Sequence, residues 1–133
     1  IIVFDKALKA KQNGRFKEAI AHYLNALEYS DVDQYNINFD IAKCYMEIND
    51  YQNAVKYFDA MKNVTYWGQG HMKKFYHAKN ILYSGLANLE LNNYRIAQSK
   101  IETFLKIWEN APESLKDKKL AREALKKINN ITS

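Results

Sequence analysis

The chain has 133 residues, a formal net charge of +5 and 47% hydrophobic residues. This length is that of one domain, and the apolar fraction is enough for a continuous core. No run of eighteen apolar residues is present, so no membrane-spanning helix is expected, and the single Cys44 excludes an internal disulfide.

The first pair of helices is predicted over residues 1–12 and 16–29, with Asn13-Gly14 as the break between them. Val3, Phe4, Ala7 and Leu8 already recur in helical period. No charged segment or small-residue cleavage site precedes them, so we expect a cut edge of a longer protein. The alternative is the remnant of a removed signal.

Two further pairs are predicted over residues 34–48 and 51–62, and over about 71–91 and 94–110. Asp31 or Asp33 is a natural N-cap for the second pair. Asn49-Asp50 and Asn92-Asn93 fall at the same point of each pair as Asn13-Gly14. Asn, Asp and Gly tolerate the left-handed conformation that ends a helix tightly, which predicts turns inside helical hairpins.

A last amphipathic helix is predicted over about residues 113–130, after the helix stop at Ala111-Pro112. Its apolar face holds Leu115, Ala121, Ala124, Leu125 and Ile128. Residues 114–117 resemble a capping box at its start. Six basic and three acidic residues give this stretch most of the excess positive charge, which we interpret as a solvated outer face. The alternative is a nucleic-acid-binding helix, although a denser basic stripe is usual in that class.

Cys44 lies between Ala42 and Tyr45 in an apolar helix, without a nearby His or basic cluster. We expect it to be a buried core residue and not a nucleophile. No segment alternates with period two, so no sheet is expected and the fold class is all-α.

One register of side chains recurs in the second helix of each pair. The positions are Phe16, Ala19, Tyr23 and Ala26, then Tyr51, Ala54, Phe58 and Met61, then Tyr94, Ala97, Ile101 and Phe104. The first step is 35 residues and the second is 43 at all four positions. A fixed register with a period near 34 is typical of a helical repeat array, in which the small residue lies where two helices cross closely.

Further positions match a known repeat pattern: Ile41, Ala42 and Tyr45 in the second pair, Gly14 in the first, and Gly85 in the third. With these, the chain resembles the tetratricopeptide repeat family over about residues 3–108, and residues 104–125 also resemble repeat segments of bacterial signalling proteins. Ser84 and Asn88 depart from the pattern. The resemblance implies an α-solenoid of three hairpins, at about 1–30, 33–62 and 71–110, wound in a right-handed superhelix. A capping helix at about 113–130 would complete one domain over 1–133.

In that family the first helices line a concave groove that binds other proteins. The resemblance places ten residues on this face: Phe4, Leu8, Lys11, Phe39, Lys43, Met46, Lys79, Leu82, Leu86 and Leu89. Their spacing within each helix keeps them on one side. An apolar floor with a few Lys residues favours an amphipathic helix or an extended peptide. The alternative is that the chain's own ends cover part of this floor.

The resemblance also suggests a second ligand, the C-terminal carboxylate of a chaperone tail. Lys79 matches one position that grips such a tail. Phe4, Leu8 and Tyr83 occupy other positions and supply no suitable charge or amide, and Asp40 would repel the carboxylate. We therefore expect no chaperone-tail binding.

Eight extra residues separate the second and third pairs and leave an aromatic segment at residues 64–70. Tyr66 and Trp67 lie there beside two glycines. An aromatic loop of this kind is a candidate partner-binding loop. The alternative is that these rings fold back and cover the exposed end of the second hairpin.

Enzyme chemistry finds no support in the sequence. His22, His71 and His77 are scattered, and neither a zinc-ligand cluster nor a Gly-rich phosphate loop is present. We expect no catalytic residue, metal, cofactor or small-molecule substrate. The predicted function is a cytoplasmic protein–protein interaction module, an adaptor or scaffold, and the alternative is a regulatory repeat segment of a larger signalling or transcription-control protein. Self-association through the first helix stays open.

Overall fold

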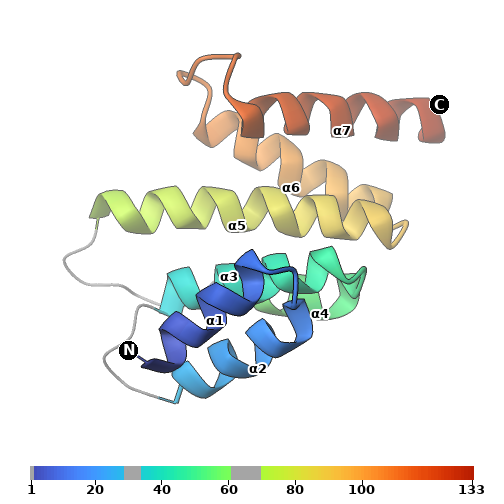
Figure 1. Cartoon of the computed structure of the whole chain (residues 1–133). Helices are drawn as coiled ribbons and strands as arrows, with labels where there is room; N and C mark the ends of the chain where they lie inside the picture. Colours follow the sequence, from blue (N-terminus) through green and yellow to red (C-terminus); the bar gives the residue numbers. More distant parts are fainter. Residues whose placement is uncertain (1, 29–33, 61–69) are drawn as a thin grey trace. The chain divides into compact units, whose positions relative to one another are not determined.

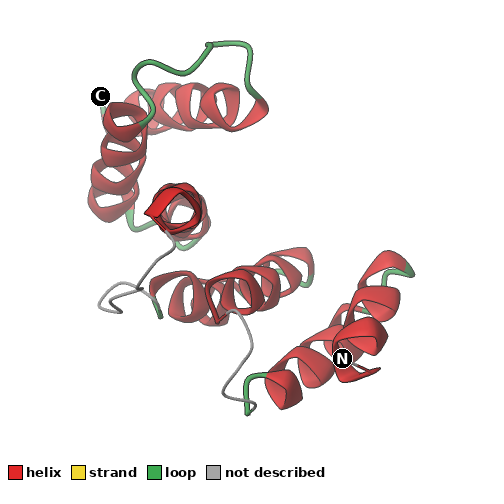
Figure 2. Ribbon diagram, turned by 90° about the vertical axis from the view of Figure 1, so that its left-hand side faces the viewer, coloured by secondary structure: helices red, strands yellow, loops and turns green. Residues whose placement is uncertain are grey.

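The computed structural model describes the backbone of residues 2–28, 34–60 and 70–133, and the side chains of 5–28, 37–60 and 77–133. Within these ranges the chain forms seven helices and no strand, which confirms the all-α prediction (Figures 1 and 2). No helix of the described part is both long and apolar enough to cross a membrane.

The helices divide between two compact units, Ile1–Thr65 and Tyr66–Ser133, called unit 1 and unit 2 below. Unit 1 contains α1 (Ile2–Gln12), α2 (Phe16–Ala26), α3 (Gln34–Glu47) and α4 (Tyr51–Asp59). Unit 2 contains α5 (Gly70–Glu90), α6 (Tyr94–Ile107) and α7 (Lys116–Thr132). Each of α1, α3 and α5 packs on the helix that follows it; α2 also packs on α3, and α7 packs on α6 and α5.

The three turns that join these helix pairs have the same geometry. Each contains one residue in the left-handed region: Gly14 (φ 76°), Asn49 (φ 59°) or Asn92 (φ 64°). The next residue donates its backbone N–H to the carbonyl five residues earlier, over 2.8, 2.9 and 2.9 Å. This is the long hydrogen bond of a Schellman motif, which satisfies a carbonyl at the helix end. The predicted turns are confirmed.

Aromatic side chains reinforce two of the turns. The Tyr51 hydroxyl donates to Asn49 Oδ1 over 2.8 Å, and the Tyr94 hydroxyl donates to Asn92 Oδ1 over 3.0 Å. The tyrosine that opens α4 or α6 therefore holds the left-handed asparagine before it. The sequence register places these aromatics at the turns, but the hydrogen bonds become visible only in the structure.

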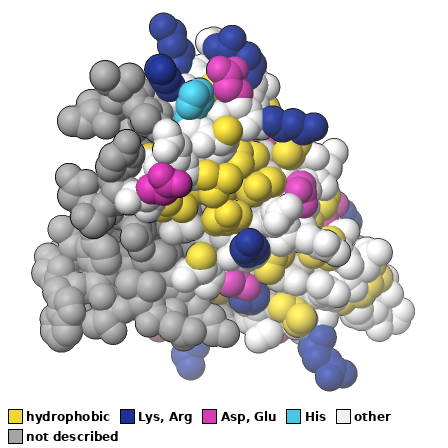
Figure 3. Space-filling model, turned by 90° about the horizontal axis from the view of Figure 1, so that it is seen from below, with side chains coloured by type: hydrophobic (Ala, Val, Ile, Leu, Met, Phe, Trp, Pro, Cys, Tyr) yellow, Lys and Arg dark blue, Asp and Glu magenta, His cyan; other side chains and the backbone are white. Residues whose placement is uncertain are grey.

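Small residues of the register lie in the core, as predicted. Ala19, Ala54 and Ala97 have no exposed surface, and Cys44 is buried. Burial raises the pKa of the Cys44 thiol to about 11, so it stays protonated and inert at neutral pH. In the space-filling view, apolar side chains gather in the middle of the visible face (Figure 3). Apart from this view, the partly buried apolar side chains that pack on the core of unit 1 are Phe16, Leu24, Leu27, Tyr45, Ile48 and Tyr57.

Several helix ends differ from the predictions. The second helix ends at Ala26, not at residue 29, and α6 ends at Ile107, not at residue 110. The ring of Trp108, the C-cap of α6, packs on Phe104 with centroids 4.7 Å apart.

The predicted capping box at residues 114–117 is wrong. Leu115 is the N-cap of α7 and makes no side-chain capping bond. Asp117, the expected return partner, instead accepts a hydrogen bond from the Tyr83 hydroxyl over 2.8 Å. The Asp117 side chain therefore makes a tertiary contact with α5 and not a local capping bond.

Candidate functional site

In unit 1, the predicted groove residues lie on α1 and α3 with different exposures. Leu8 is 40% exposed, whereas Phe39 is only 8% exposed and its ring packs against Phe58 at a centroid distance of 5.8 Å. Lys11, Lys43 and Met46 are half-buried. Phe4 lies in α1, but its side chain is outside the described part of the chain. Of these residues, Leu8 is thus exposed and Met46 is partly accessible.

An ion pair links the two helices that carry these residues. Lys11 Nζ of α1 lies 3.4 Å from Asp40 Oδ1 of α3, with side-chain exposures of 34% and 23%. Burial raises the pKa of Asp40, and the charges of Lys11 and Lys43 only partly oppose this effect. Sequence patterns assigned Asp40 no role beyond repelling a carboxylate. Its partner is 29 residues away in another helix, and no spacing rule connects the two.

The Lys11–Asp40 pair lies close to buried polar side chains. Tyr23 is fully buried, and desolvation, followed by the charges of Asp40 and Cys44, raises the pKa of its phenol. The phenol is therefore neutral throughout the physiological range. The pKa values of Tyr23, Asp40 and Cys44 are all raised, whereas an activated nucleophile has a lowered pKa.

Replacing Asp40 with asparagine is expected to stabilise the fold at pH 7. The pKa of Asp40 is raised in the folded protein, so Asp40 contributes most favourably to stability when the pH is below its pKa in the unfolded state. This contribution is lost as the pH rises through the pKa of the folded state. An uncharged amide side chain at this position avoids this loss, and the gain is up to about 1 kcal/mol for a partly exposed ionic site. Urea unfolding of both proteins at several pH values measures it.

The difference between Asp40→Asn and the native chain should shrink as the pH falls towards 3.8, the ordinary value for aspartate. Glu47→Gln, an exposed change on the same helix, serves as the control and should stay within about 0.5 kcal/mol of the native protein. A lower stability of Asp40→Asn at pH 7 would show that the Lys11 contact outweighs the desolvation of the carboxylate.

In unit 2, half of the predicted groove residues have little accessible surface. Leu82 is 0% exposed and Leu89 is 8% exposed, so both belong to the core. Leu86 and Lys79 are half-buried and remain accessible. Helical spacing puts the four residues on one side of α5 but does not tell which of them other helices cover.

The accessible side of α5 is tied to α7 through one carboxylate. Asp117 accepts a hydrogen bond from Tyr83 and lies 3.5 Å, Oδ2 to Nζ, from Lys79. Asp117 and Tyr83 are 8% and 7% exposed. Burial raises the pKa of Tyr83, and the hydrogen bond to Asp117 and the charge of that carboxylate add to this effect. The Lys79 charge is thus partly engaged inside unit 2.

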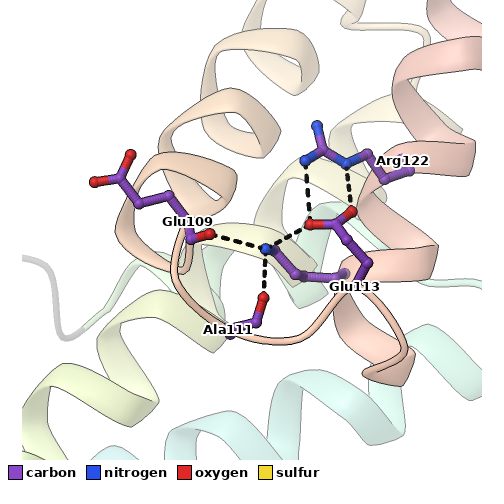
Figure 4. Close-up of polar contacts among 5 residues, drawn as sticks. Glu109, Ala111, Glu113 and Arg122 are labelled. Carbon is purple, nitrogen blue, oxygen red and sulfur yellow. Dashed lines mark hydrogen bonds and ion pairs between the residues drawn. The ribbon is translucent and has the colours of Figure 1, made fainter.

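Lys118 contacts residues of the connection between α6 and α7, and Figure 4 labels Glu109, Ala111, Glu113 and Arg122 of this group. The Lys118 side chain is 1% exposed, and Nζ donates to the carbonyl oxygens of Ala111 at 2.7 Å and Glu109 at 3.3 Å. The same nitrogen lies 2.7 Å from Glu113 Oε2, and Arg122 donates to both Glu113 oxygens. Hydrogen bonds from Arg122 and Lys118 lower the pKa of Glu113 to about 2. A cation here satisfies carbonyls that follow the end of α6.

The burial of Lys118 corrects one prediction about the last helix. Lys116, Lys119, Lys126 and Lys127 are exposed, as expected for a solvated outer face, but Lys118 is not. Its charge is used inside the protein and is unavailable to a nucleic acid.

The proposed loop site lies outside the part of the chain that the structure describes. Tyr66 and Trp67 both belong to residues 61–69. Among the described residues, no group of three or more His, Cys, Asp or Glu side chains is placed to hold a metal ion.

No protein-family model matches the chain, and a search of curated proteins finds no match. Any functional assignment therefore depends on the repeat register, the turn geometry and the side chains described above.

Proposed function

We propose that this chain is a tetratricopeptide-like interaction module that holds a peptide or helix of a partner protein against α1, α3 and α5. The observation that carries the proposal is the repeated turn. The left-handed residues Gly14, Asn49 and Asn92 are 35 and 43 residues apart, the same steps as the aromatic–alanine register. One turn chemistry in one register supports three copies of one hairpin. The proposal includes a right-handed superhelix with α7 as its cap.

The accessible side chains on these helices suggest the chemistry of the ligand. Leu8, Met46 and Leu86 offer apolar contacts, whereas the Lys11 charge is already paired with Asp40. Such a surface suits a ligand with two or three hydrophobic anchors. Each buried anchor contributes about 1.5–3 kcal/mol, and ordering costs reduce the sum to roughly −8 kcal/mol, or micromolar affinity.

The double variant Leu8→Glu/Leu86→Glu should abolish peptide capture without unfolding the protein. A displayed library of random 16-residue peptides is selected on the immobilised native chain, and the recovered peptides are then tested on the variant. Two buried glutamates facing apolar anchors should weaken binding at least tenfold. Circular dichroism checks that the variant is folded.

The matched control is Ala21→Glu/Ile96→Glu, which makes the same kind of change at exposed positions of α2 and α6. The proposal predicts native affinity for this control. Peptides that bind the folded Leu8→Glu/Leu86→Glu variant and the control equally well would exclude the first-helix surface as the recognition site.

A further inference from the structure

A second surface of unit 2 has the form of a docking site. Helices α6 and α7 border an open pocket of about 430 Å³, lined by Gln98, Glu102, Leu105, Arg122, Leu125 and Asn129. Leu105 and the half-buried Leu125 provide apolar surface, and the other four residues are polar. None of the six belongs to the first-helix surface proposed above.

The arrangement of the lining residues suits a helix. On α6 they are spaced by four and then three residues, and on α7 by three and then four, so each set follows one side of its helix. Each row extends over seven residues, about 10 Å. Two such rows form a trough into which the ridge of a third helix fits. A small molecule would need a more enclosed pocket, which buries most of its surface.

The charge around the trough indicates which helix would fit. Residues 66–133 hold twelve of the chain's twenty Lys and Arg residues but six of its fifteen Asp and Glu residues. Lys119 and Lys126 are exposed one turn before and after Arg122 on α7, and Arg95 and Lys106 are exposed on α6. Glu102 is the one acid among the pocket-lining residues. The flanks of the trough therefore attract negative charge.

We propose that the pocket between α6 and α7 docks an amphipathic helix of a partner protein, with leucine-like anchors on one face and Asp or Glu on its flanks. The anchors contact Leu105 and Leu125, and the acids face the exposed cations. A phosphate backbone fits this pocket less well, because Leu105 and Leu125 line it and offer no hydrogen-bond donor to a phosphate.

The test uses the whole chain and a labelled 18-residue helical peptide with leucines on one face and glutamates on both flanks. Fluorescence anisotropy compares this peptide with a lysine-flanked version and with a scrambled version of the same composition. We expect the acidic amphipathic peptide to bind at least tenfold more tightly than either control. Equal binding of the lysine-flanked peptide, or of the scrambled one, would overturn the proposal.

Two neighbouring asparagines locate the site. Asn129 lines the pocket, whereas Asn130 is exposed on another side of α7. Asn129→Glu should weaken the binding of the acidic peptide about fivefold, because it places a like charge close to the peptide. Asn130→Glu should weaken this binding by less than half as much. Gln98→Glu and Ser99→Glu form an equivalent pair on α6. Equal effects within each pair would mean that the peptide responds to overall charge, which contradicts a site in the pocket.

Two more measurements separate this surface from the alternatives. The Leu8→Glu/Leu86→Glu variant should bind the acidic peptide with native affinity, since its changes lie outside the pocket. If this variant does not bind the peptide, the binding site is the first-helix surface and the proposal is overturned. The last measurement adds a single-stranded RNA oligonucleotide as a competitor. If the RNA displaces the peptide equally well from the Asn129→Glu and Asn130→Glu proteins, the surface is a phosphate-binding face and the proposal is overturned.

Discussion

Replacing Asp117 with alanine is expected to lower the free energy of unfolding by about 3 kcal/mol, because a buried charged group with two partners is lost. Tyr83 would keep a buried hydroxyl without its acceptor, and Lys79 would lose the carboxylate 3.5 Å away. Both partners come from α5, so the variant weakens the packing of α7 on that helix. Urea unfolding followed by circular dichroism measures the change.

Two further proteins test the physical reason. Glu123→Ala removes an exposed acid from the same helix and should change stability by no more than about 0.5 kcal/mol. A double-mutant cycle with Tyr83→Phe should give a coupling energy of about 1 kcal/mol or more between Tyr83 and Asp117. Equal losses for Asp117→Ala and Glu123→Ala would show that the buried carboxylate contributes no more than a surface charge.

Replacing Gly85 with valine is expected to destabilise the protein by about 3 kcal/mol, the upper end of the usual cost of overpacking. A Cβ atom at Gly85 would lie 3.0 Å from Ile101 Cγ1, 3.2 Å from Lys100 Cβ and 3.3 Å from the carbonyl oxygen of Ala97. The last of these is backbone and cannot move without shifting α6. Glycine is therefore what allows α5 and α6 to approach at this crossing.

A smaller substitution gives the graded comparison. Gly85→Ala should cost about 1 kcal/mol, since overpacking is partly offset by the better helix propensity of alanine. In an Ile101→Ala background the cost of Gly85→Ala should fall, because one of the three contacts is gone. Strictly additive effects of the two changes in urea unfolding would contradict a direct contact at this crossing.

Features that depend on neighbouring residues were predictable from the sequence. The left-handed residues Gly14, Asn49 and Asn92 sit where a tight helix end needs them, and their own backbone preferences mark them out. The burial of Ala19, Ala54 and Ala97 was predictable from their fixed offset behind each turn. Both signals are local, so a single sequence contains them.

Features that depend on distant partners were not predictable. The capping box failed because Tyr83, 34 residues away, binds Asp117. Lys118 had the pattern of a surface lysine, and only the path of the chain after α6 brings carbonyls to it. Leu82 and Leu86 share one predicted face, but only Leu82 is fully covered, since periodicity gives a direction and not the neighbours found there.

The pairing of each of α1, α3 and α5 with the helix that follows it has a consequence for how the protein is made. Contacts between segments adjacent in the sequence close short loops at little entropic cost, so proteins built from them fold rapidly. Such a pair is complete as soon as its second helix has left the ribosome. The α1–α2 hairpin can therefore acquire its native contacts while α7 is still being synthesised, which shortens the time that its apolar faces are exposed to other nascent chains.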